Sequence, residues 1–143
     1  MENNLINILM ETDPEKLARR VKKEVEIKRL SDILGAPFIV TVKALPGERY
    51  SELVGNMVDD DGDVDYAMVY NANLMVALDG MISPDVRNRD LQKHYGCATP
   101  KELMEVLFNG GEVVKIADAV TELSGYGKDT EKKVKNSSAR TEK

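Results

Sequence analysis

The sequence predicts an α+β fold, mainly α with one antiparallel β-hairpin. Three observations lead to this fold class. The 143 residues, 42% of them hydrophobic, are enough for one domain with a real core. β-Branched residues concentrate in one short run, 38–43, whose composition is typical of a strand. Most of the remaining chain shows apolar residues at helical spacing between capping residues and glycines. We therefore expect residues 1–127 to form a single small helical domain.

The first elements are predicted to be short helices followed by a strand. Asn3 or Asn4 can cap a helix at the start of the chain. Asp13-Pro14 can open a second helix, because Asp accepts from free N–H groups and Pro is tolerated at the first helical position. From Glu24 to Lys28 charged and apolar residues alternate, which predicts a half-buried strand. A single helix from Pro14 to Leu34 is the alternative, because the apolar residues there also fit helical spacing.

This strand and the run 38–43 predict the antiparallel hairpin, over about residues 23–44. Gly35-Ala36-Pro37 breaks the chain between the two strands. A hairpin is not stable alone, so it must pack on helices or pair with another chain. The residues expected to build the hairpin and the turn after it are Val25, Ile27, Phe38, Val40, Val42, Pro46 and Gly47.

Several helices are predicted after the hairpin, over about residues 47–57, 64–82, 84–95, 100–108 and 112–124. The helix over 64–82 is apolar on most sides, which is typical of a helix packed by several neighbours. Thr99-Pro100-Lys101-Glu102 has the spacing of a capping box, with Pro at the first helical position. Gly125 is expected to close the last helix.

Charge is unevenly distributed along the chain. The formal net charge is −5, yet residues 128–143 hold six basic and three acidic side chains, net +3. That segment has one strongly apolar residue, Val134, so we expect a disordered basic C-terminal tail. The acidic balance of the rest argues against a nucleic-acid binder. The single Cys excludes an intramolecular disulfide. No apolar run is long enough for a membrane span, and no secretory signal opens the chain.

No residue set in the sequence predicts catalysis or a cofactor. His94 and Cys97 are the only His and Cys, and no further residue completes a nucleophile or zinc site with them. The acidic run Asp59–Asp65 fails the EF-hand spacing, because Met57 and Met68 would occupy positions that require acids. A solvated loop before a helix explains it better, and an irregular calcium site stays an alternative. We therefore predict that the protein is not an enzyme, with a small regulatory enzyme or metal binder as a further alternative.

Two parts of the sequence resemble a known family. KEVEIKRLS at residues 23–31 and PFIVTVKALPGERY at residues 37–50 are similar to the XkdN-like family of phage tail assembly chaperones. TPKELMEVLFNGGEVVKIADAVTELSGYG at residues 99–127 looks like the closing helices of several tail chaperone families, which often end in E-L-S-G-[FY]-G. The resemblance covers about residues 4–127.

The resemblance implies a specific role in phage tail assembly. Chaperones of this family coat the long, helix-rich tape-measure protein, keep it soluble in the bacterial host cytoplasm and hand it to tail-tube subunits. They are absent from the mature virion. The family also makes a longer product by translational frameshifting, and the basic tail is one place where such a product could diverge. No catalytic residues carry over, because the family has none.

Partner contacts are predicted from apolar helical faces and from the methionine content. The chain has seven Met, whose flexible thioethers suit surfaces that adapt to varied apolar partners, although core packing is the better explanation for any single Met. The alternative function is a structural tail component, such as a tube or baseplate subunit. An unpaired hairpin edge allows a homo-oligomer without predicting one. The predicted partner-binding residues are Met68, Tyr70, Met75, Leu103, Leu107 and Phe108.

Overall fold

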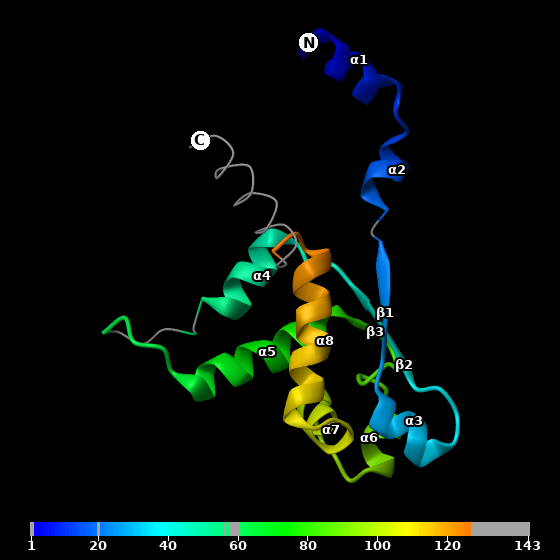
Figure 1. Cartoon of the computed structure of the whole chain (residues 1–143), viewed down its shortest axis with the longest axis vertical. Coiled ribbons are helices and arrows are strands. Elements are labelled where there is room, and N and C mark those ends of the chain that lie inside the picture. The colour runs from blue at the N-terminus through cyan, green and yellow to red at the C-terminus, as the bar shows by residue number, and fades with distance from the viewer. Residues whose placement is uncertain (1, 20, 56, 58–60, 127–143) are drawn as a thin grey trace, which may run out of the picture.

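The computed structural model describes residues 2–19, 21–55, 57 and 61–126. The predicted basic tail, 128–143, lies outside these described residues. The described part is an α+β domain with a three-stranded antiparallel sheet, which confirms the predicted class (Figure 1). Its elements are α1 (Glu2–Glu11), α2 (Pro14–Ala18), β1 (Lys22–Glu26), α3 (Lys28–Leu34), β2 (Ile39–Lys43), α4 (Gly47–Val54), α5 (Tyr66–Gly80), β3 (Met81–Ser83), α6 (Arg89–His94), α7 (Pro100–Leu107) and α8 (Gly110–Leu123).

The predicted hairpin is present as β1 and β2. The two strands pair antiparallel, with Val25 opposite Val40. Their connection contains the short helix α3, which ends at Gly35 in the left-handed conformation with φ 69°. The alternative of one helix over residues 14–34 is wrong, because the alternating segment pairs with β2 and places Val25 in the core.

A third strand corrects the predicted end of the long central helix. The expected helix over 64–82 begins at Tyr66 and ends at Gly80, and Met81–Ser83 pairs with the second edge of β2. A strand of three residues is too short to show a period of its own. The conformation of Met81–Ser83 is therefore determined by its backbone hydrogen bonds to β2.

The other helices agree with the predictions apart from their ends. The helix predicted over 84–95 begins only at Arg89, because the side chain of Asn88 caps it by accepting from the N–H of Leu91 at 3.0 Å. The helix predicted over 47–57 ends at Val54. At the N-terminus, the Asp13 side chain accepts from the N–H of Glu15, as expected for a helix opening.

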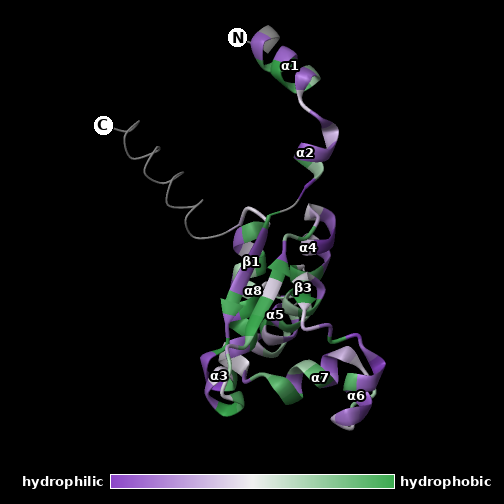
Figure 2. Cartoon of the chain, turned by 90° about the vertical axis from the view of Figure 1, so that its right-hand side faces the viewer, coloured by the Kyte–Doolittle hydropathy of each residue, from purple (hydrophilic) through white to green (hydrophobic). Residues whose placement is uncertain are grey.

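The core lies between the sheet and the helices α5 and α8. Figure 2 views the sheet from its outer face, with α5 and α8 behind it. α5 is buried on several sides only in its second half, and its first half extends away from the core. The largest fully buried side chains come from the sheet and from α5, α7 and α8, with two from connecting segments: Ile27, Val40, Val42, Leu74, Val76, Val86, Leu103, Met104, Val113, Ile116 and Val120.

Candidate partner-binding surfaces

Two of the predicted partner-binding residues belong to the core. Leu103 is completely buried, and the Phe108 side chain is 3% exposed. The Phe108 ring makes an edge contact with Phe38 from the hairpin, with 6.2 Å between ring centroids. Contact of Leu103 or Phe108 with a partner is therefore not supported by this structure. An apolar helical stripe has the same spacing whether it faces the core or a partner, so the sequence could not separate these cases.

The other predicted residues lie closer to the surface, but the structure does not bring all of them together. Tyr70, Met75 and Leu107 are half-buried. Tyr70, in α5, lies beside the start of α8. A Cβ added at Gly110 would be 3.7 Å from the Cε1 atom of Tyr70. Met68 is 43% exposed and lies in the half of α5 that extends away from the core.

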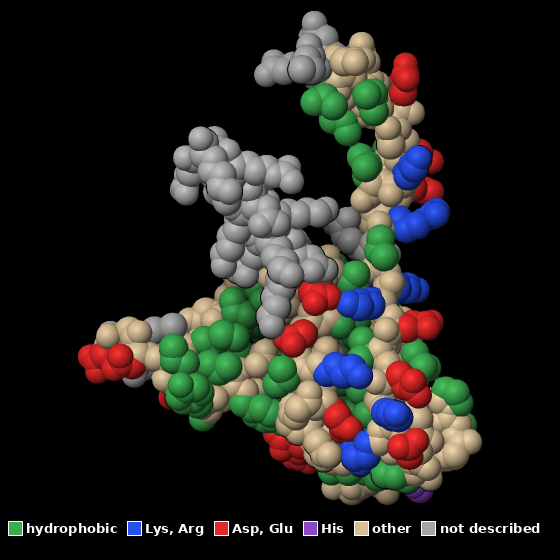
Figure 3. Space-filling model, in the orientation of Figure 1, with side chains coloured by type: hydrophobic (Ala, Val, Ile, Leu, Met, Phe, Trp, Pro, Cys, Tyr) green, Lys and Arg blue, Asp and Glu red, His purple; other side chains and the backbone are tan. Residues whose placement is uncertain are grey.

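Met68 is one of several exposed apolar side chains at the outer end of α5. Val64 and Tyr66 next to it are also exposed, Tyr66 by 84%. We call Val64, Tyr66 and Met68 the outer α5 surface. Hydrophobic side chains gather over this end of the molecule in Figure 3. Asp65 holds the helix start there, because its carboxylate accepts from the N–H of Ala67 at 3.0 Å.

A larger exposed apolar surface lies on the N-terminal arm, which we define as α1 and α2. The arm extends away from the rest of the domain (Figures 1 and 2), and none of its described side chains is buried. The sequence predicts this first helix but not that its apolar side chains stay uncovered, because periodicity does not reveal what a helix packs against. The large hydrophobic side chains of α1 that are more than half exposed are Leu5, Ile6, Ile8, Leu9 and Met10.

The turn 44–50 and the closing segment 122–126, which both carry the family resemblance, contact each other. The N–H of Leu45 donates to Ser124 Oγ at 3.0 Å. The rings of Tyr50 and Tyr126 are stacked, with 4.4 Å between centroids and 9° between planes. Gly47 begins α4 beside this stack, since a Cβ there would lie 3.7 Å from the hydroxyl of Tyr126. These two segments therefore fix the end of the described chain against α4.

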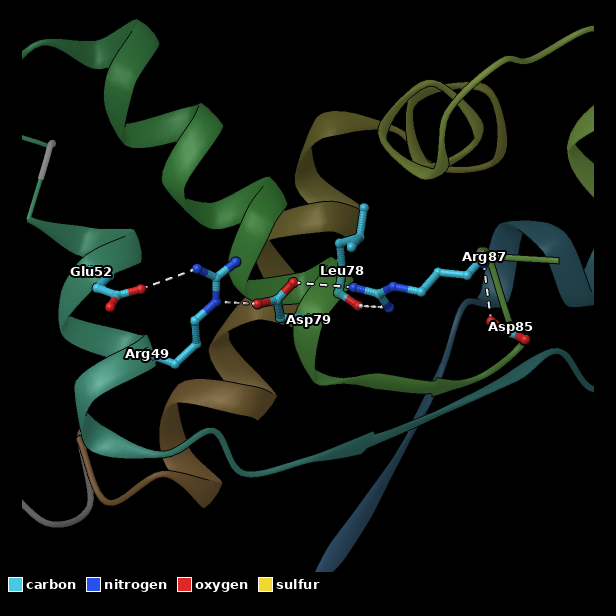
Figure 4. A network of polar contacts seen from close by, with 6 residues as sticks. All are labelled: Arg49, Glu52, Leu78, Asp79, Asp85 and Arg87. Carbon is cyan, nitrogen blue, oxygen red and sulfur yellow. Dashed lines mark hydrogen bonds and ion pairs between the residues drawn. The ribbon is translucent and has the colours of Figure 1, made fainter. Parts of the chain in front are cut away.

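A network of charged side chains ties α4 and α5 to the loop before α6 (Figure 4). Asp79, only 14% exposed, pairs with Arg49 at 2.6 Å and with Arg87 at 3.2 Å. Arg87 also donates to the carbonyl of Leu78 at 3.4 Å, and Arg49 pairs with Glu52 at 3.2 Å. Each charge has a partner, so the network explains packing rather than chemistry.

A second ion pair joins α3 to the start of α8. The guanidinium of Arg29 donates to the Glu112 carboxylate at 2.9 and 3.0 Å and to the carbonyl of Leu107 at 2.9 Å. Glu112 also accepts from the N–H of Asn109 at 2.8 Å and so completes the capping box of α8. The hydrogen bonds from Arg29 hold the pKa of the Glu112 carboxyl below its usual range, against the opposing effect of desolvation.

Of the residues considered for chemistry, those that the structure describes do not assemble into a site. His94 makes a ring-edge contact with Tyr95 at 4.9 Å, and the Cys97 thiol donates to the Tyr95 carbonyl at 3.6 Å. Asp59 and Asp60 of the acidic run lie outside the described residues. Within the described part of the chain, no group of three or more His, Cys, Asp and Glu side chains could hold a metal ion. No helix in that part is both long and apolar enough to cross a membrane.

A cleft of about 330 Å³ lies between β1 and α8. At one end Lys23 pairs with Glu122 at 2.7 Å. At the other end Lys115 Nζ donates to the backbone carbonyl of Glu26 at 3.0 Å. The residues that line the cleft are Lys23, Glu24, Val25, Glu26, Lys115, Asp118, Ala119 and Glu122.

Comparisons with known proteins assign the chain to a family. No curated protein matches it. The crystal structure of the protein yqbn is similar, with 25% sequence identity, 73% of this chain and 86% of that chain covered, and a TM-score of 0.49. The family model for phage XkdN-like tail assembly chaperone proteins matches residues 6–137, which extends beyond the described residues. The chain therefore belongs to the XkdN-like family of phage tail assembly chaperones.

Proposed function

We propose that this tail assembly chaperone binds the tape-measure protein of its phage and keeps it soluble until the tail tube polymerises. The observation that carries the proposal is the N-terminal arm, whose helix α1 leaves Leu5, Ile6, Ile8, Leu9 and Met10 more than half exposed. An exposed apolar face of this kind is typical of a surface that a partner covers. The outer α5 surface supplies a second, smaller contact area.

The chemistry of the arm suits a helical client. An amphipathic helix recognises a partner by laying its apolar face against another apolar surface. Burying one of these large side chains completely contributes about 1.5–3 kcal/mol, so a few of them provide useful affinity without irreversible binding. Met10, which is 82% exposed, can adapt its flexible thioether to varied contacts.

The net charge supports the second half of the proposed function. The chain carries a formal net charge of −5, which favours solubility of a complex whose client is rich in apolar helices. We place this activity in the bacterial host cytoplasm during assembly. Transfer of the client to tail-tube protein then releases the chaperone, so the mature virion does not contain it.

Co-purification with the tape-measure protein tests the role of the arm. The test variant is Leu5→Asp with Leu9→Asp, at positions 62% and 57% exposed on α1. The matched control is Ile33→Asp with Leu34→Asp, at positions 66% and 61% exposed on α3. We expect the arm variant to lose most of the bound client and the control to retain it, with circular dichroism showing both folded. Equal retention by both variants would exclude the arm as the main contact.

Mass spectrometry of purified tails provides an independent check. A chaperone that is released should be absent or present only in traces. Recovery in amounts comparable to a tail subunit would instead indicate a structural tail component.

A further inference from the structure

β1 is an edge strand whose outer side faces the cleft. It pairs with β2, and no other described strand pairs with it. The N–H of Ile27 donates to the carbonyl of Phe38 at 3.0 Å. In an antiparallel strand, the N–H and C=O groups of successive residues point to alternate sides. Those of Ile27 and Val25 therefore face β2, and those of Glu24 and Glu26 point away from it. The hydrogen bond from Lys115 to the Glu26 carbonyl agrees with this direction.

The side chains of this edge form a short alternating pattern. Glu24 and Glu26 lie on the outer face of the sheet, and Val25 between them lies on the core face. No hydrogen bond or ion pair joins the carboxylate of Glu24 to another described residue. An added strand with the order basic, apolar, basic would therefore place opposite charges beside the two glutamates.

The basic tail contains that order in Lys133-Val134-Lys135. With Val134 opposite Val25, the two lysines lie opposite the two glutamates in either strand direction, because both triplets are symmetric. The family match includes the triplet, since it extends to residue 137.

The tail also begins in a suitable place. The N–H of Tyr126 donates to the carbonyl of Thr121 at 3.1 Å, so the described chain ends at the last turn of α8. Glu122 in that turn lines the cleft. Six residues such as 127–132 can span up to about 20 Å of chain. Four residues of a strand such as β1 span only about 13 Å, so this length of chain is sufficient to bring the triplet to Val25.

We propose that Lys133-Val134-Lys135 adds as a fourth strand to the edge of β1 that no described strand occupies, within the cleft between β1 and α8. A second copy of the chain fits less well, because aligning its Val25 with this Val25 sets glutamate against glutamate. Pairing with the tail would cover an edge that otherwise invites association with other chains. The pairing is independent of whether the chain binds a tape-measure protein.

Amide hydrogen exchange of the full-length chain, followed by NMR, tests the pairing. We expect slow exchange at Glu24 and Glu26, whose N–H groups face the cleft. The double variant Lys133→Glu with Lys135→Glu should accelerate both by about tenfold or more, because an opened strand edge exposes its amides. Val25, whose N–H faces β2, is the internal reference and should not change.

The control variant is Lys128→Glu with Arg140→Glu, which changes the net charge of the tail equally but leaves the triplet intact. It should retain slow exchange at both glutamates. Fast exchange in the unmodified chain would overturn the proposal. Protection that survives the triplet variant would overturn it as well, and protection that depends on protein concentration would instead assign the edge to a second copy.

Discussion

Gly80 lies where the end of α5 contacts α8. A Cβ at this position would lie 2.7 Å from Val120 Cγ1 and closer still to Cγ2. Val120 is fully buried, and side chains in a close-packed interior have little room to move. The absence of a side chain at residue 80 therefore allows the two central helices to pack closely.

Substitution of Gly80 tests this close approach. We expect Gly80→Ala to lower the free energy of unfolding by about 1–3 kcal/mol, because the added methyl overpacks the core. Gly111→Ala is the control, since a Cβ at Gly111 meets no atom within 4 Å. The control should be neutral or slightly stabilising, because Ala favours a helix more than Gly does. Urea denaturation measures both, and an unchanged midpoint for Gly80→Ala would show that α5 and α8 can separate at little cost.

Glu112 makes the stability of the fold depend on pH. Arg29 lowers the pKa of its carboxyl in the folded state, so this carboxylate stabilises the fold above its unfolded pKa near 4.5. That contribution is lost as the pH falls through the lower, folded pKa. We expect Glu112→Gln to be less stable than the unmodified chain at pH 7, and the difference to shrink below about pH 4.5.

Denaturation at several pH values measures this effect. Glu105→Gln is the control, because no hydrogen bond or ion pair to a described residue engages this exposed side chain of α7. If the difference in the free energy of unfolding between Glu112→Gln and the unmodified chain did not change with pH, the carboxylate would act through its shape rather than its charge.

The contact of α4 with the end of α8 depends on two tyrosines. Tyr50 and Tyr126 stack, and the Tyr50 hydroxyl donates to Thr121 Oγ1 at 3.3 Å. Such an aromatic pair contributes about 0.5–1.5 kcal/mol beyond the area that it buries. Because α4 has no fully buried residue, this pair and the pair between Arg49 and Asp79 add to the packing of its half-buried apolar side chains on the core.

Removal of Tyr126 should therefore loosen α4 selectively. We expect Tyr126→Ala to speed amide exchange in α4 while the amides of β2 remain protected. Tyr95→Ala is the matched control, because Tyr95 is 47% exposed against 49% for Tyr126 and its ring contacts only the neighbouring His94 ring among described rings. Equal effects of the two variants on α4 would contradict the role of the stack.

The elements of the fold could be predicted where local signals were strong. Asp13 and Thr99 act as helix caps as predicted, and the alternation around Val25 together with the β-branched run at Val40 predicted the hairpin, although not its register. The third strand could not be predicted, because its conformation depends on an edge of β2 that is distant in sequence. Tertiary hydrogen bonds decide the conformation of such short segments.

The binding surface was harder to predict than the fold. Leu103 and Met68 both lie on apolar stripes, yet Leu103 packs in the core and Met68 is 43% exposed. The arm has the same kind of pattern and is left uncovered where it extends away from the domain (Figure 1). Which stripes face inward depends on the arrangement of the whole molecule, and this does not follow from the spacing of residues in a single helix.

At the level of the whole molecule, the domain combines a well-packed body with exposed apolar side chains, including those of the arm and of the outer α5 surface. The body is held by its core and by the Asp79 and Glu112 networks. The arm and the outer α5 surface are left available. This division is suited to a chaperone that stays folded while it binds and releases a client.

The solubility of the tape-measure protein, expressed in bacteria with and without this chain, tests the central claim most directly. The measured quantity is the fraction of the tape-measure protein that remains in the supernatant after centrifugation of the lysate. We predict a large increase when the chain is present, and a much smaller one with the variant Leu5→Asp and Leu9→Asp. An equally low soluble fraction with and without the chain would contradict the account.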